Sequence, residues 1–139
     1  MHSDKSLRIT VQINISAPVE KVCDYWTTPK HIMNWNFASD YWQTTFSEND
    51  LRPGGKFLSR MEAKDGSSGF DFAGTYDEVK LYERISYTLG DRKVQIDFIP
   101  GNGETALIES FDAEETYSPE KQQQGWQAIL NNFKMYVEQ

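Results

Sequence analysis

Glu109 is the residue of this sequence whose setting best suits acid–base chemistry or the anchoring of a ligand. It alternates with Leu107 and Phe111 in a strand-like segment, so the three side chains share one face. If that face is buried, the carboxyl lies among apolar side chains and its pKa rises. The opposite register turns Glu109 into water. The sequence leaves both registers open and slightly favours the solvated one, in which Glu109 is a surface charge.

The other reactive side chains form no catalytic or metal-binding motif. His31 falls in the first turn of a short helix, where a lone histidine is typically a surface or capping residue. Cys23 has no sequence-local histidine to activate it and is interpreted as a core residue. There is no Cys-x-x-Cys or His-Glu-x-x-His spacing, phosphate-binding loop, dinucleotide fingerprint or nucleophile elbow. We therefore assign no catalytic residue, no metal and no cofactor.

Composition narrows the classes of partner. The chain has 139 residues, with 14 Lys and Arg against 21 Asp and Glu, and its formal charge is −7. Such a charge disfavours nucleic acid and anionic membrane surfaces, which are polyanions. No apolar run approaches the length of a membrane span, so no membrane insertion is expected. The single cysteine and the lack of a signal peptide favour a cytoplasmic location.

The elements that position these residues are predicted from periodicity and turn signals. Residues 8–16 alternate strictly between apolar and polar, as in a half-buried strand, and two short helices follow, starting near Pro18 and at Thr28-Pro29. Thr28 is the expected N-cap of the second. Separators rich in Gly, Pro, Asn and Asp then divide six strands, which indicates antiparallel hairpins. We place these strands near residues 42–46, 56–63, 69–79, 84–89, 93–99 and 104–111.

A long helix ends the chain, from Ser118-Pro119 to Val137. Its apolar residues recur at spacings of three and four and form one broad face: Trp126, Ile129, Leu130, Phe133, Tyr136 and Val137. That face predicts packing on the sheet. Gly125 inside this helix costs roughly 1 kcal/mol relative to alanine. We expect tight packing of helix on sheet as the reason, with ligand access as the alternative.

The whole chain resembles the Hsp90-ATPase-activator-homologue branch of the START-like superfamily. The resemblance spans about residues 7 to 137 and follows the order of elements together with several short stretches: residues 17–22 (APVEKV), Trp35, residues 51–57 (LRPGGKF), residues 74–79 (GTYDEV) and Gly125-Trp126. It implies an α+β helix-grip fold, in which a curved antiparallel sheet of about seven strands wraps around the long C-terminal helix. We expect one domain over residues 1–139, with residues 1–6 as a disordered tail.

The resemblance also implies a hydrophobic cavity between sheet and helix. The chain has 19 aromatic residues, and aromatic walls with a few polar groups are typical of small-molecule pockets. For any single aromatic residue, filling the core is the commoner role. The expected cavity lining is Trp35, Phe57, Met61, Phe72, Tyr76, Tyr87, Phe98, Glu109, Trp126 and Leu130.

Three functions follow from this resemblance. The first, which we favour, is a non-catalytic domain that binds a small hydrophobic, aromatic or lipid-like molecule. The second is an enzyme of the polyketide cyclase or aromatase type, for which Glu109, Tyr76 and Tyr87 are the candidates, provided that they face inward. The third is an interaction module for a chaperone. A chaperone partner lacks support in the sequence, because the chain has no room for the additional N-terminal domain of the eukaryotic co-chaperone.

Overall fold

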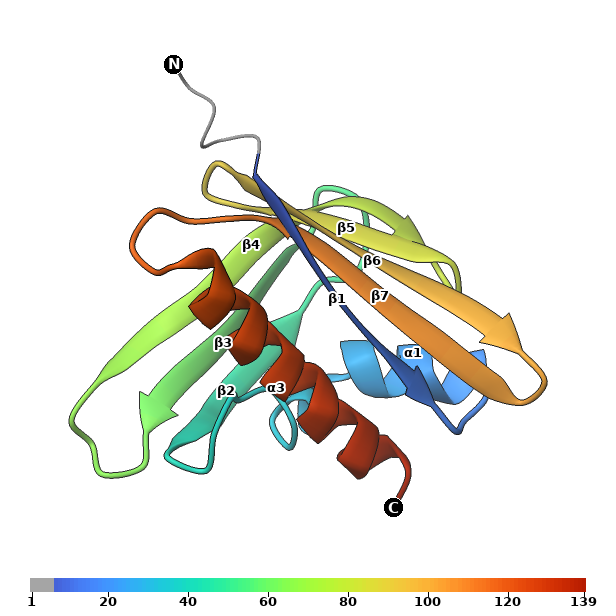
Figure 1. The fold of residues 1–139 in the computed structure, drawn as a ribbon, viewed down its shortest axis with the longest axis horizontal. Coiled ribbons are helices and arrows are strands. Elements are labelled where there is room, and N and C mark those ends of the chain that lie inside the picture. Colours follow the sequence, from blue (N-terminus) through green and yellow to red (C-terminus); the bar gives the residue numbers. More distant parts are fainter. Residues whose placement is uncertain (1–6) are drawn as a thin grey trace.

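The structure, a computed structural model, describes residues 7–139; the expected disordered tail at residues 1–6 lies outside the described residues. Strands and helices follow the predicted order (Figure 1). They are β1 (Arg8–Ile15), α1 (Val19–Thr27), α2 (Pro29–Ile32), β2 (Trp42–Asn49), β3 (Lys56–Ala63), β4 (Gly69–Lys80), β5 (Arg84–Leu89), β6 (Arg92–Gly101), β7 (Glu104–Asp112) and α3 (Pro119–Val137).

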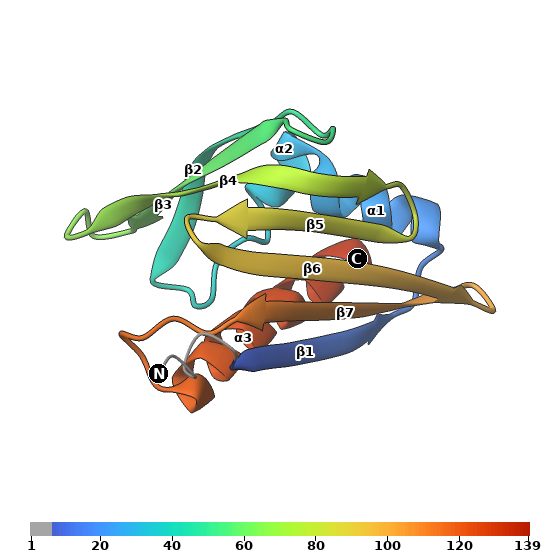
Figure 2. The same ribbon diagram turned by 90° about the horizontal axis from the view of Figure 1, so that it is seen from above.

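The seven strands form one antiparallel sheet in the order β1-β7-β6-β5-β4-β3-β2. Strands β2 to β7 are joined in sequence as hairpins, and β1 pairs with β7, so the first and the last strand of the chain lie side by side. The sheet curves around α3, as Figures 1 and 2 show. This arrangement confirms the predicted helix-grip fold.

The core lies on the concave face of the sheet because each strand alternates. In β7 the inward side chains are Thr105, Leu107, Glu109 and Phe111, all at most 4% exposed, while the residues between them are partly exposed. β5 and β6 alternate in the same way. The helix α1 adds Val22 and Cys23 to this core. Burial of these apolar surfaces supplies the main stabilising term of the fold.

Helix α3 is fixed at its start by a cap and along its length by contacts with β1. The Ser118 side chain accepts a hydrogen bond from the Lys121 amide, as expected for an N-cap. On the side of β1, Gln127 Nε2 donates to Gln12 O at 3.1 Å and Lys134 Nζ donates to Asn14 O at 2.6 Å. The apolar face carries Leu130, Phe133 and Val137 into the core. The helix therefore lies against β1, at one edge of the sheet.

Two elements differ from their predicted form. β2 runs to Asn49 rather than ending at residue 46, because a bulge between Thr44 and Phe46 shifts the register and lets the strand continue. α2 is a single turn, and Trp35 lies beyond it. Thr28 occupies the N-cap position of α2, but its side chain forms no capping hydrogen bond. Its hydroxyl donates to Asp24 instead.

Gly125 does not have the role expected from the sequence. A Cβ added at this residue would meet no atom of a neighbouring element within 4 Å. Close packing of helix on sheet is therefore not the reason for glycine at this place, and that prediction was wrong.

None of the helices within residues 7–139 is long and apolar enough to cross a membrane. Over the same residues, no group of three or more His, Cys, Asp or Glu side chains is placed to hold a metal ion.

Candidate functional site

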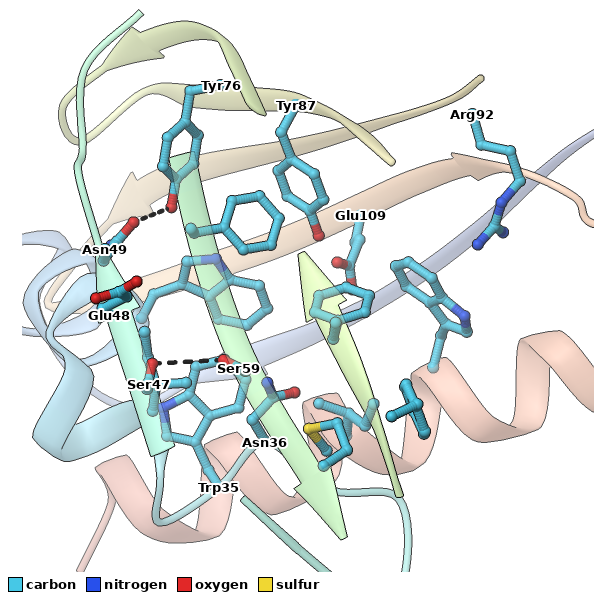
Figure 3. A pocket seen from close by; sticks show the side chains of 18 of the residues that line it. Trp35, Asn36, Ser47, Glu48, Asn49, Ser59, Tyr76, Tyr87, Arg92 and Glu109 are labelled. Carbon is cyan, nitrogen blue, oxygen red and sulfur yellow. Dashed lines mark hydrogen bonds between the residues drawn. The ribbon is translucent and has the colours of Figure 1, made fainter. Parts of the chain in front are cut away.

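A pocket of about 290 Å³ lies between α3 and the half of the sheet formed by β2 to β5 (Figure 3). It exists because α3 packs on β1 at one edge, while the curved sheet carries β2 to β4 away from the helix (Figure 2). Eight of the ten expected cavity residues line it: Trp35, Phe57, Met61, Phe72, Tyr76, Tyr87, Glu109 and Trp126.

Phe98 and Leu130 do not line the pocket. Both side chains are buried, at 3% and 0% exposure, but they belong to the packed part of the concave face. Phe98 lies opposite Leu107 near the far end of β6, the strand that contacts α1. Inward direction is thus necessary for lining the pocket but not sufficient, because the pocket occupies only one end of the concave face.

Aromatic rings form one wall of the pocket. The Phe57 ring lies 5.2 Å from that of Tyr76 and 4.8 Å from that of Tyr87, measured between centroids. Such tilted and edge-on contacts stabilise aromatic pairs beyond the area they bury. At the opposite side, Trp126 stacks on Phe111 with centroids 3.9 Å apart. The wall is therefore apolar and held in place by ring contacts.

Glu109 faces the pocket from β7 and is 4% exposed. The inward register is the right one, and the slightly favoured solvated register was wrong. Burial raises the pKa of the Glu109 carboxyl to about 8. Within residues 7–139 no side chain or backbone group forms a hydrogen bond with this carboxyl, as Figure 3 also shows for its neighbours. Glu109 is therefore a protonated acid at neutral pH with unmet hydrogen-bonding capacity.

Tyr87 lies next to Glu109, and its hydroxyl points towards that carboxyl (Figure 3). Tyr87 is 7% exposed, and burial raises the pKa of its phenol well above the ordinary value, with the nearby Glu109 adding to the effect. Tyr76 differs because its hydroxyl donates to Asn49 Oδ1 at 2.6 Å. Burial also raises the pKa of Tyr76. Both tyrosines stay neutral at physiological pH.

Further polar groups surround the apolar wall. Ser47 and Ser59 form a hydrogen bond of 3.4 Å between their hydroxyls on β2 and β3. Arg92, at the start of β6, donates to Asp112 O at 3.3 Å. Glu114 has a buried Oε1 with no hydrogen-bond partner among the described residues. The pocket thus combines an apolar centre with polar groups around it.

His31 and Cys23 do not line the pocket. The His31 ring stacks on Tyr25 with centroids 3.9 Å apart, and its Nδ1 lies 2.6 Å from the Tyr136 hydroxyl. It is therefore a partly buried packing residue rather than a simple surface residue. Cys23 is a core residue, as predicted, and burial raises the pKa of its thiol.

The structure adds eleven lining residues to the expected set: Trp26, Ile32, Asn36, Ser47, Glu48, Asn49, Ser59, Phe70, Arg92, Glu114 and Ile129. Ile129 lies on the face of α3 that the sequence pattern marked as apolar, and Trp26 and Ile32 come from the short helices α1 and α2. The polar members carried no such signal. Ser47 and Asn49 come from the part of β2 beyond the bulge, so strand parity counted from Trp42 assigns them to the wrong face.

Comparisons with known proteins agree with this architecture. A family profile described as Activator of Hsp90 ATPase homolog 1-like protein matches residues 16–138. The solution structure of the AHSA1-like protein from Aeromonas hydrophila is 45% identical, with 95% of this chain and 92% of that chain covered and a TM-score of 0.89. A Cytophaga hutchinsonii protein is 52% identical, with coverage of 94% and 92% and a TM-score of 0.82.

A more distant relative shows how far the fold extends. A Chromobacterium violaceum protein is 26% identical, covers 96% of this chain and 99% of that chain, and has a TM-score of 0.86. A search of curated protein sequences found no match. Since the family profile covers nearly the whole chain and two relatives of 45% and 52% identity share its fold, the chain belongs to the Activator of Hsp90 ATPase homolog 1-like family.

Proposed function

We propose that this protein binds a small, largely apolar molecule in the pocket between α3 and β2 to β5. The observation that carries the proposal is the lining: rings from three strands and from the helices form the apolar centre of a space of about 290 Å³, and polar side chains surround that centre. Pockets of this size with aromatic walls are typical of small-molecule sites. The helix-grip fold of the family supports the same function.

A thermal-shift screen with apolar probes tests this proposal. Naphthalene derivatives such as 2-ethylnaphthalene are suitable probes because their rings match the aromatic wall. A ligand that binds only the native state raises the melting temperature by mass action. We expect a shift that grows with probe concentration and a heat of binding in calorimetry.

Two variants assign the binding to the pocket. Ser59→Leu adds apolar volume to the lining and should weaken probe binding at least tenfold, whereas Ile99→Ala, on an exposed side chain outside the pocket, should leave the affinity unchanged. Circular dichroism shows whether each variant is folded. If no apolar probe binds the folded protein, the proposal is wrong, and protein partners such as a chaperone become the next candidates.

A second function, proton-transfer catalysis on the bound molecule, is favoured by one observation. Glu109, Tyr76 and Tyr87 all face the pocket, and the pKa of Glu109 is about 8, close to the operating pH that suits a general acid or base. Mass spectrometry of a bound polyketide-like substrate after incubation tests this function. Conversion that is lost in Glu109→Gln would support catalysis, and recovery of unchanged substrate would leave binding alone.

A further inference from the structure

The hydroxyl of Tyr87 and the carboxyl of Glu109 come together from two strands of the concave face. β6 lies between β5 and β7, and the register places Tyr87 opposite Val94 and Glu109 opposite Ile96. The two side chains are therefore diagonal neighbours across one intervening strand, and both are long enough to reach across it. Figure 3 shows the two polar ends turned towards each other inside the pocket.

These two groups are built into the pocket without a protein partner. Glu109 is 4% and Tyr87 7% exposed, and neither forms a hydrogen bond with the other or with another of the residues 7–139 drawn around them. The neighbouring Tyr76 shows the contrast, because its hydroxyl is already bonded to Asn49. The polar atoms of Glu109 and Tyr87 are not sealed from the pocket, unlike Glu114 Oε1, so a ligand atom inside the pocket can reach both.

The protonation of the two groups decides which ligand atom suits them. The pKa of Glu109 is about 8, so at neutral pH the carboxyl carries its proton and can donate it in a hydrogen bond, as can the Tyr87 phenol. The charged groups that line the same pocket are Glu48 on β2, Arg92 on β6 and Glu114 after β7. Arg92 and Glu114 bear opposite charges, and burial alone accounts for the raised pKa of Glu109.

We propose that Glu109 and Tyr87 form a subsite for a neutral acceptor oxygen, such as a ketone carbonyl, on a ligand whose apolar body lies against Phe57, Phe72 and Trp126. Two hydroxyl donors that face one point can both donate to a carbonyl oxygen, which has two lone pairs. A ligand carboxylate is disfavoured because it would lose its hydration in an apolar pocket, where the one cation among the lining residues, Arg92, already donates a hydrogen bond to Asp112 O. This inference rests on the proposed binding function and gives it a ligand class.

A matched series of probes tests the subsite. 2-Acetylnaphthalene, 2-ethylnaphthalene, 2-naphthoic acid and 1-(2-naphthyl)ethylamine share one ring system and differ in the group offered to Glu109 and Tyr87. Calorimetry at pH 6.5 with the full chain should give about tenfold tighter binding for the ketone than for the hydrocarbon, because one added hydrogen bond is worth roughly 1.4 kcal/mol. The carboxylate and the ammonium should bind more weakly than the ketone.

Variants that each remove one hydroxyl group show which residues cause the preference for the ketone. Tyr87→Phe removes one donor and keeps the ring, so the ratio of ketone to hydrocarbon affinity should fall about threefold or more, and with Glu109→Leu added it should approach one. Tyr76→Phe is the matched control: its hydroxyl is already paired, so the variant should change both affinities alike and keep the tenfold ratio. The ketone preference of the parent should also decline as pH rises through about 8, where Glu109 loses its proton.

The outcomes separate this inference from the proposed function. If neither 2-ethylnaphthalene nor 2-acetylnaphthalene binds, the binding function fails. If it binds as tightly as the ketone, or if Tyr87→Phe keeps the ratio, the subsite is wrong while the binding function stands. A tightest affinity for the ammonium would also overturn the subsite, because it would mean that Glu109 acts as an anion.

Discussion

Glu109 is kept neutral by its surroundings rather than by a partner. The carboxyl lies in an apolar pocket, and burial is the cause of its raised pKa of about 8. An ionised carboxylate at the same place would lose its hydration without gaining a hydrogen bond or a counter-ion. The residue therefore couples the stability of the fold to pH.

The direction of that coupling follows from the two pKa values. The ordinary carboxyl value is 4.5 and the folded value is about 8, so between these pH values the folded protein binds more protons than the unfolded chain. Its stability should decrease as pH rises through this window, by on the order of 5 kcal/mol in total. Below about pH 4.5 Glu109 should contribute no pH dependence.

Glu109→Gln tests the coupling because glutamine keeps the shape and does not titrate. In urea denaturation at several pH values, the variant should gain stability relative to the parent between about pH 4.5 and 8, and the difference should level off above this range. A difference that stays constant with pH would contradict a raised pKa at this residue.

Gly125 gives a prediction at the scale of the helix. Since a Cβ at this residue would meet no neighbouring atom within 4 Å, Gly125→Ala should stabilise the protein by about 1 kcal/mol through the better helix propensity of alanine. The matched control is Gly74→Ala in β4, where a Cβ would lie 2.6 Å from Thr88 O and 2.8 Å from the Phe57 ring. We expect that variant to lose roughly 1–3 kcal/mol.

Thermal denaturation of both glycine variants measures these effects. A loss of stability in Gly125→Ala would mean that the helix does need glycine for close packing. A gain in stability together with weaker binding of an apolar probe would instead indicate that the glycine leaves room for a ligand at the side of the pocket.

Thr105 gives a second prediction at the scale of an element, because it ties β7 to the start of α1. Its hydroxyl donates to Ala17 O at 2.9 Å and is fully buried. Thr105→Val removes the donor and leaves the Ala17 carbonyl unpaired, which should cost about 1–3 kcal/mol. Thr88→Val, at a partly exposed strand residue, should cost less than half as much. Chemical denaturation compares the two, and equal losses would contradict a specific role for the Thr105 bond.

The elements show what the sequence could and could not predict. Strict alternation placed β1, and the turn residues around them placed β5 and β7, each within one residue of its bounds. The end of β2 could not be predicted, because the bulge after Thr44 reverses which side chains face inward and no turn residue marks it. The same limit applies to the pocket: parity identified Phe57, Tyr76 and Tyr87, but it could not separate the hollow end of the concave face from the packed end that holds Phe98.

At the scale of the whole molecule, the two halves of the sheet differ in how much of their surface is buried and covered by helices. β1, β7 and β6 alternate between buried and exposed residues and lie under α3 or α1, whereas β4 begins with exposed residues at Gly69 and Phe70 and borders the pocket. Strands with few buried contacts open at lower free energy than core strands.

The rate of backbone hydrogen exchange should therefore differ between the two halves of the sheet. We expect backbone amides of β2 to β4 to exchange faster than those of β6 and β7, and a bound apolar probe to slow exchange mainly in β2 to β4. Exchange measured by mass spectrometry on peptides from each half checks this. Uniform protection of all seven strands would contradict this difference between the halves.

The single cysteine has a consequence for measuring such openings. Cys23 is 2% exposed in α1, and its raised thiol pKa keeps it in the unreactive protonated form. A thiol reagent can modify it only when α1 leaves the sheet. With one cysteine in the chain, every labelling event reports the same opening. The rate at which a thiol reagent modifies Cys23 therefore measures how often α1 separates from the sheet, and no engineered label is needed.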